Sequence, residues 1–280
     1  MQDDTDCDDS SADTHPDTNE VGCDGLDNDC DGTIDLNRVP SDHGTLMDAV
    51  DALPDGSEVC VEPGTYAEVL DLGDRNLRFT GQLGPGSTVL DLGSSHPMVT
   101  AGGGAVAFSG FTVTGDLDGT EAPVEGAFVR IEGGSLELSN VEMSAVSAST
   151  AADGVLVWAL DAALSLNQVR VDGVEIVLST ADVELQGGLL HVEGGSLDLL
   201  DLSVSGLEVL GVDGEGRCLV SGAALYTDGV VLSGQGVEVK DSRVDLTCTE
   251  RVSTSGMLYL LKSDGQLDGV RVAQTSVGLA

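Results

Sequence analysis

Basic residues are scarce in this chain: 11 Lys or Arg stand against 49 Asp or Glu, a formal net charge of −38 over 280 residues. So acidic a surface repels phosphate backbones and anionic lipid headgroups, which makes nucleic acid and bare membrane poor partners. Long apolar runs are also missing, since none reaches the ~18 residues of a membrane-spanning helix. We expect no direct membrane insertion, and a protein suited to cations or to a calcium-rich medium.

Closely spaced cysteine pairs are absent as well. The six cysteines include no C-x₂-C pair of the kind that zinc sites use, although two of them bracket an Asp-rich stretch. An even cysteine set without such pairs favours two or three disulfides and an oxidising compartment. We predict a Cys218–Cys248 disulfide, because both residues lie in the C-terminal part about one repeat apart, and leave the pairing of the other four open. The predicted location is therefore extracellular or at the outer cell surface.

The first 37 residues hold thirteen Asp or Glu and no Lys or Arg, a density that repels itself unless a cation sits within it. Asp27, Asp29 and Asp31 lead into Gly32 in the D-x-[DN]-x-[DN]-G order of a calcium loop. Arg38 stands where an EF-hand has its bidentate Glu, so the segment is not an EF-hand proper. The candidate ligands of this loop are Asp24, Asp27, Asp29, Asp31 and Asp35 by their side chains and Thr33 by its carbonyl.

A second acidic cluster, Asp4, Asp6 and Asp8, has the same spacing but carries Asp9 where a glycine is expected. Calcium, a hard cation that takes oxygen ligands, is the predicted metal. Copper is the less favoured alternative, because it prefers imidazole or sulfur and only His15 and His43 lie nearby. A solvated acidic linker without a metal is the competing interpretation.

After residue 38 the composition changes to Gly, Val, Leu and Ser, and a repeat begins. Its units start near residues 98, 128, 156, 190, 225 and 258, and each holds short stretches with apolar residues at every second position, the period of strands with one buried face. One residue of a type that tolerates left-handed backbone angles interrupts each unit. In aligned order these residues are Gly110, Asn140, Gln168, Asp201, Asp241 and Gly269.

One-residue bends cannot form hairpins, but they can wind short strands into stacked coils. The predicted fold is therefore all-β: a right-handed, single-stranded parallel β-helix over residues 39–280, preceded by a small irregular metal-binding segment over residues 1–38. An all-β sandwich is the competing fold. Thr45 as N-cap, apolar residues on one face of 45–53 and Pro54 as a stop predict a short helix that caps the first coil. We expect further protein beyond Ala280, and the acidic start after Met1 suggests an excised fragment.

Residues 45–92 resemble the first coil of pectin-lyase-like right-handed β-helix proteins. The resemblance is carried by the capping-helix segment, by the Asp55-Gly56-Ser57-Glu58-Val59-Cys60-Val61 and Pro63-Gly64-Thr65-Tyr66 stretches, and by the strand over residues 77–81. It implies the fold and says nothing about activity.

Residues 6–35, with Cys7, Cys23 and the run from Asp27 to Gly32, resemble the Asp/Cys-rich metal-binding motif of the MopE type. This motif is common on secreted and surface proteins of myxobacteria and is named after a copper-binding surface protein of a methanotroph. An upstream D-x-D-G-D-G-x-G stretch that family members usually carry is absent here. The resemblance implies a divalent metal as partner and a surface location.

The function that we predict is a secreted or cell-surface calcium-binding scaffold or adhesion module without catalytic activity, with cell-wall or extracellular polysaccharide or surface proteins as possible partners. A polysaccharide lyase or esterase acting on an acidic glycan is one alternative, and a copper-binding surface protein is another. Arg170, Arg243 and Arg271 lie near the bends and could stack with Glu142 either as a catalytic set or as a structural charge row. Aromatic residues make up only 3% of the chain, so Trp158, Tyr226 and Tyr259 form either an exposed file or packed edges. His191 is predicted to be structural.

Overall fold

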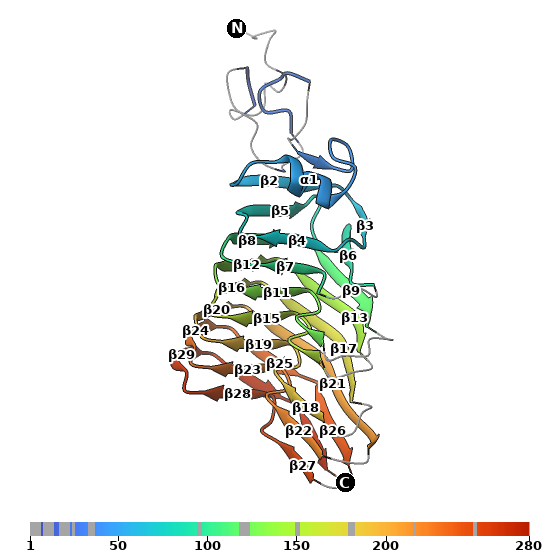
Figure 1. The fold of residues 1–280 in the computed structure, drawn as a ribbon, viewed down its shortest axis with the longest axis vertical. Helices are drawn as coiled ribbons and strands as arrows, with labels where there is room; N and C mark the ends of the chain where they lie inside the picture. Colours follow the sequence, from blue (N-terminus) through green and yellow to red (C-terminus); the bar gives the residue numbers. More distant parts are fainter. Residues whose placement is uncertain are drawn as a thin grey trace.

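The chain winds into a long stack of parallel coils (Figure 1). The computed structural model describes residues 7, 14–16, 23, 26–32, 37–93, 97–117, 124–148, 152–178, 183–214, 217–248 and 251–279. All strand pairs in these residues are parallel, as the pairs Val129 with Val157 and Leu136 with Leu164 illustrate. The predicted parallel β-helix is therefore confirmed, and the sandwich, which needs antiparallel hairpins, is excluded.

Three sheets run the length of the stack. Sheet A has nine strands, in spatial order β1 (Arg38–Val39), β2 (Ser57–Val61), β5 (Leu77–Gly81), β8 (Ala105–Ser109), β12 (Ser135–Ser139), β16 (Ala163–Asn167), β20 (Ser196–Leu200), β24 (Val231–Gln235) and β29 (Asp264–Asp268). Sheet B has ten, namely β3 (Gly64–Tyr66), β6 (Thr88–Asp91), β9 (Thr112–Asp116), β13 (Glu142–Ala148), β17 (Arg170–Leu178), β21 (Ser203–Gly214), β25 (Glu238–Lys240) and β30 (Arg271–Ala273), with β26 (Arg243–Cys248) beside β21 and β31 (Ser276–Leu279) beside β26.

Sheet C completes the coil with seven strands: β4 (Leu70–Gly73), β7 (Val99–Ala101), β11 (Val129–Glu132), β15 (Val157–Leu160), β19 (Leu190–Glu193), β23 (Leu225–Asp228) and β28 (Leu258–Leu261). Two small sheets lie between the end of sheet B and the start of sheet C. One pairs β10 (Val124–Glu125) with β14 (Ala152–Asp153), and the other orders β18 (Val183–Gln186), β22 (Arg217–Ser221) and β27 (Arg251–Thr254).

The core is a set of stacked apolar columns, because alternate residues of each strand point inward. In β5 the pattern is visible residue by residue: Leu77, Phe79 and Gly81 are buried while Arg78 is exposed. Phe79 and Phe108 occupy register positions in neighbouring coils and stack with ring centroids 4.8 Å apart. Such ladders of like residues bury each coil against the next, which is how a repeat too small to fold alone becomes stable.

Single residues with positive φ turn the chain from sheet A into sheet B. Gly110, Asn140, Gln168, Asp201 and Gly269 have φ angles between 50° and 78°, as the predicted bends require. Asp241 is the exception. The sequence alignment placed it in this column, which is wrong: the register puts Gly236 there.

Asp241 makes a second bend instead, between β25 and β26, both in sheet B. It aligns with Gly173 and Gly206, which also have positive φ. Apolar residues alternate on both sides of Gly236 and of Asp241, so the sequence pattern fits either register. Cross-strand pairing alone distinguishes the two.

Helix α1 (Leu46–Ala52) closes the first coil, as predicted (Figure 1). The Thr45 side chain accepts a hydrogen bond from the Asp48 N–H at 3.0 Å, which caps the helix. Leu46, Ala49 and Val50 are buried against the stack. No helix of the described residues is long and apolar enough to cross a membrane.

Candidate functional site

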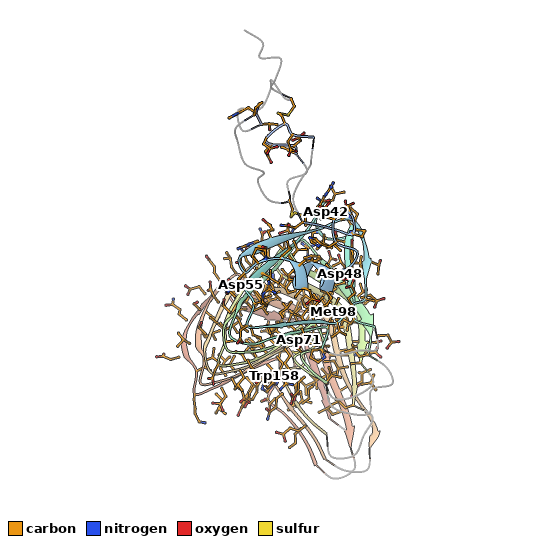
Figure 2. The ribbon with its side chains drawn as sticks, turned by 45° about the horizontal axis from the view of Figure 1, so that its top comes forward. Asp42, Asp48, Asp55, Asp71, Met98 and Trp158 are labelled. Atoms are coloured by element: carbon orange, nitrogen blue, oxygen red, sulfur yellow. A yellow bond between two sulfur atoms is a disulfide. The ribbon has the colours of Figure 1, made fainter. Side chains whose placement is uncertain are left out.

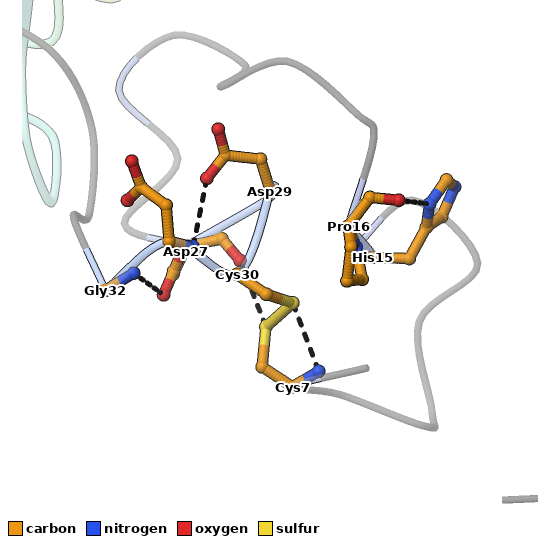
Figure 3. The surroundings of a disulfide bond; sticks show 8 residues. Cys7, His15, Pro16, Asp27, Asp29, Cys30 and Gly32 are labelled. Atoms are coloured by element: carbon orange, nitrogen blue, oxygen red, sulfur yellow. Dashed lines mark hydrogen bonds between the residues drawn. A yellow bond between two sulfur atoms is a disulfide. The ribbon is translucent and has the colours of Figure 1, made fainter. Parts of the chain in front are cut away.

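The Asp-rich loop gathers three of its predicted ligands at one point. Asp27, Asp29 and Asp31 each offer a carboxylate oxygen, and these oxygens all lie within 4.8 Å of one another. Figure 3 shows the hydrogen bonds that fold the loop: the Asp31 N–H donates to Asp27 Oδ1 at 3.0 Å and to Asp29 Oδ1 at 3.1 Å, and the Gly32 N–H donates to Asp27 Oδ2 at 2.9 Å. Positive φ at Cys30 and Gly32 curls the backbone so that alternate side chains converge.

Two disulfides hold this loop in place. Cys7–Cys30 ties the loop to the start of the chain, and Cys30 stands between two of the clustered carboxylates (Figure 3). Cys23–Cys60 ties the segment to β2, where Cys60 is buried. The sequence left the pairing of these four cysteines open. Cys218 and Cys248 lie in β22 and β26, but their side chains fall outside the described residues, so their disulfide stays a prediction.

The donor set fits a hard cation better than copper. Three carboxylates supply oxygen, which Ca²⁺ takes in sets of six to eight with backbone carbonyls and water. The four cysteines nearest the loop are bonded to one another and offer no thiolate. His15 Nδ1 is hydrogen-bonded to the Pro16 carbonyl at 2.8 Å, which occupies one nitrogen of this imidazole. Six predicted metal ligands lie outside the described residues, namely Asp24, Thr33, Asp35, Asp4, Asp6 and Asp8.

A file of stacked side chains crosses the outer face of sheet C. Trp158, His191, Tyr226 and Tyr259 are register partners in successive coils, with ring centroids 4.9 to 5.9 Å apart and interplanar angles of 15° to 22°. From the sequence, Trp158, Tyr226 and Tyr259 were expected either to form an exposed row or to pack against their neighbours. The structure supports the second interpretation, because the rings stack face to face and His191 and Tyr226 are buried.

His191 is a structural residue, as predicted. Its Nδ1 lies 2.9 Å from the Gln186 carbonyl and its Nε2 lies 3.1 Å from Glu193 Oε1. Both ring nitrogens are thus held by contacts with neighbouring residues of the coil. The contact with Gln186 was not predictable from the sequence, because Gln186 belongs to the small sheet β18–β22–β27, whose strands depart from the repeat.

Charged groups continue the file toward the N-terminal end. The Arg130 guanidinium lies 4.9 Å from the centroid of the Trp158 ring and pairs with Glu132 at 2.7 Å. Nearby, Asp153 accepts a hydrogen bond from the Gln186 N–H at 2.7 Å. Burial raises the pKa of Asp153 to about 6, against that hydrogen bond and the opposing charge of His191. Asp153 was not predicted from the sequence, because its burial comes from strands that lie outside the repeat pattern.

The three basic residues near the bends do not form one charge row. Arg170 and Arg271 share a column with Glu142, whereas Arg243 lies in a different column of sheet B. Arg243 pairs with Glu208 at 2.8 Å, and Arg271 lies 3.4 Å from Glu238. Those two are structural ion pairs at the surface of the coil.

Residues 6–35 match the MopE-type family model described as "Putative metal-binding motif". The N-terminal segment therefore carries this motif, and Asp27, Asp29 and Asp31 lie within the matched residues. The match covers a small part of the chain and leaves the metal unnamed. No curated protein matches this chain.

Two solved structures illustrate the architecture. Pectin methylesterase from Aspergillus niger is 12% identical, with 87% of this chain and 85% of that chain covered at a TM-score of 0.31. The A-module of the mannuronan C-5 epimerase AlgE6 from Azotobacter vinelandii is 15% identical, with 84% and 93% covered at a TM-score of 0.24. Likeness at these scores carries no argument about activity, and the fold assignment rests on the parallel strand pairing itself.

Proposed function

We propose that the chain is a non-catalytic, calcium-stabilised β-solenoid that acts outside the cell or on its outer surface as a rigid scaffold or adhesion module. The observation that carries this proposal is the convergence of Asp27, Asp29 and Asp31 in a loop that one disulfide closes and another joins to the first coil. Disulfides are typical of oxidising compartments, where calcium is also plentiful enough for weak sites.

We assign a different role to each of the two parts that the Cys23–Cys60 disulfide connects. Residues 1–38 would hold the metal, and residues 39–280 would form the solenoid that sets the reach of the module. Asp24, Thr33 and Asp35 would complete the coordination shell, and Asp4, Asp6 and Asp8 would form a second, less complete site. Partner surfaces would be polysaccharide or protein outside the cell.

Calcium titration tests the proposal directly. We expect Ca²⁺ to bind with a Kd of roughly 10⁻⁴ to 10⁻³ M, and Asp29→Asn to weaken it about tenfold or more because one carboxylate charge is lost. Isothermal titration calorimetry on both proteins makes the measurement. The matched control is Asp264→Asn, the same change at an exposed Asp in β29. If Asp29→Asn and the native chain bind Ca²⁺ with equal affinity, the proposed calcium site is wrong. Tighter binding of Cu²⁺ than of Ca²⁺ would favour the copper alternative.

A polysaccharide lyase or esterase is the second candidate. The observation that favours it is Asp153, whose pKa near 6 suits a general acid or base close to neutral pH. Unsaturated product or released methanol from uronate polymers, lost in Asp153→Asn, would support the enzyme. If the native chain does not turn over these polymers, the scaffold function is favoured over the enzyme.

A further inference from the structure

We propose that the corner between sheets A and B holds a binding site for a neutral, polyhydroxylated ligand of the oligosaccharide class. This corner groove, of about 340 Å³, is lined by pairs of polar residues from three successive coils. The pairs are Asn140 and Glu142, Gln168 and Arg170, and Asp201 and Ser203.

The shape of the groove comes from the coil and from one inserted loop. Gln168 and its two column neighbours have positive φ, so their side chains leave the backbone at the outside of the turn. Val141 and Val169 are buried and form the floor. Pro85, in the loop between β5 and β6, contributes a wall, and the exposed Leu83 lies in the same loop. Because strands in a sheet lie 4.7–4.9 Å apart, three coils offer polar groups over about 10 Å.

Among the described residues, the polar side chains of the groove do not bond to one another, whereas several register partners elsewhere on the coils do. Glu208 with Arg243 and Glu238 with Arg271 are register partners in adjacent coils, and both form ion pairs. Glu142 and Arg170 are register partners too, yet in the described part of the chain Arg170 has no ion pair within 4.0 Å.

Serine and aspartate side chains show the same contrast. Ser147–Asp116, Ser205–Asp172 and Ser233–Asp198 hydrogen bonds join adjacent coils at 2.7 to 2.9 Å. No such side-chain bond joins the six groove residues among the residues that the structure describes. The donors and acceptors of these six side chains are therefore available to a ligand. Hydrogen bonds from the Arg170 guanidinium would be the strongest, because they are charge-assisted.

Charge selects the class of ligand. Glu142, Asp201 and the surrounding acidic surface repel anions, so uronates and phosphates are disfavoured. Arg170 in the middle of the groove repels metal ions and ammonium groups. The groove lining has no aromatic ring, which disfavours flat apolar ligands. Sugar hydroxyls both donate and accept, and they match a lining that mixes carboxylates, amides, a hydroxyl and a guanidinium.

The test is a titration of the full chain in EDTA, so that the result does not depend on calcium and fails separately from the proposed metal site. The probes are cellohexaose, xylohexaose and mannohexaose, with hexagalacturonate as the charged comparison. We expect at least one neutral hexamer to bind with a submillimolar Kd and hexagalacturonate to bind more weakly. Arg170→Gln should weaken that binding roughly 10- to 100-fold, as loss of charged hydrogen bonds does.

The control is Arg243→Gln, which removes the same charge from a paired arginine outside the groove and should leave affinity unchanged. Gln168→Asn keeps a residue that tolerates positive φ, shortens a groove side chain and should weaken binding several-fold even if Arg170→Gln disturbs the fold. The inference is overturned if none of the three neutral hexamers binds at 10 mM, roughly the weak limit of specific recognition. Tighter binding of hexagalacturonate, or equal losses in Arg170→Gln and Arg243→Gln, would overturn it as well.

Discussion

Glycines at the bends of the coils serve two different purposes, which their surroundings distinguish. Gly195 has φ +68° and lies so close to the coil before it that an added Cβ would sit 2.0 Å from the Ala162 carbonyl oxygen. That oxygen accepts the Ser196 N–H at 3.0 Å, one of the bonds between coils. Gly173 has a similar φ of +69° but meets nothing within 4 Å. The first glycine is needed for angle and space, the second for angle alone.

Alanine substitutions should resolve this difference. Gly173→Ala should cost about 1–2 kcal/mol, the penalty of a left-handed angle. Gly195→Ala should cost roughly 3 kcal/mol or more, because the Ala162 carbonyl must also move. Urea denaturation followed by far-UV circular dichroism gives both free energies of unfolding. Equal costs would mean that the coils separate easily at this corner.

Asp153 makes the folding stability of the protein depend on pH, and the sign of this dependence follows from its pKa. Its folded-state pKa near 6 lies above the ~3.9 of an unfolded chain, so the folded state favours the protonated form. The stability that this group contributes is fully present below pH ~4 and is lost as pH rises through 6. Asp153→Asn stays neutral at every pH, and its side-chain oxygen can still accept the Gln186 N–H.

We therefore expect Asp153→Asn to gain stability over the native chain as pH rises from 4.5 to 8, by of order 1–3 kcal/mol. Urea denaturation of both proteins at pH 4.5, 6 and 8 makes the comparison, and the contributions of carboxylates that do not interact with Asp153 cancel in the difference. A difference that does not change with pH would show that Asp153 titrates as it does in water.

Helix α1 is the element that closes the apolar end of the stack. In its first turn the Thr45 hydroxyl accepts the Asp48 N–H, and the Glu68 carboxylate accepts the N–H groups of Leu46 and Met47. Thr45→Ala removes the acceptor for the Asp48 N–H and should cost about 1 kcal/mol. Thr45→Ser keeps the oxygen and should cost much less. The melting temperatures of the two variants provide the measurement, and equal decreases would assign the effect to the lost methyl group instead of the cap.

Elements with a local signal were predictable from the sequence. The helix carried its own cap and stop. The resemblance to the first coil of pectin-lyase-like proteins placed β5 at Leu77–Gly81, and this prediction is confirmed to the residue. The single-residue bends at Asn140 and Asp201 were predictable because few residue types accept positive φ.

Features that depend on register were not predictable in the same way. Gly236 and Asp241 both interrupt an alternating pattern, and only the pairing with β21 shows which one turns the corner. In the candidate site, the convergence of Asp27, Asp29 and Asp31 follows from local spacing, whereas the Cys23–Cys60 bond joins residues 37 positions apart. Asp153 and the corner groove arise from contacts between coils, for which a single repeat holds no signal.

At the scale of the whole molecule, the strongly acidic N-terminal segment is joined to the solenoid by the chain and by the Cys23–Cys60 disulfide. This bond ends at β2, in the coil that α1 covers and that comes forward in Figure 2, so it is a covalent path from the metal-loop segment to this end of the stack. Ligand binding to a folded state stabilises it by RT ln(1 + [L]/Kd), roughly 1–3 kcal/mol for 10 mM Ca²⁺ at the expected affinity.

We expect the Cys23–Cys60 disulfide to transmit the stabilisation by calcium to the solenoid. In the native chain we expect 10 mM Ca²⁺ to raise the melting temperature of the solenoid by several degrees and EDTA to reverse the change. In the double variant Cys23→Ser/Cys60→Ser, calcium should still bind the loop that Cys7–Cys30 closes, but the rise in melting temperature should shrink or vanish. Differential scanning calorimetry measures the melting, and calorimetric titration measures the binding. An undiminished rise in the double variant would mean that the metal acts on the solenoid by a route other than this covalent join.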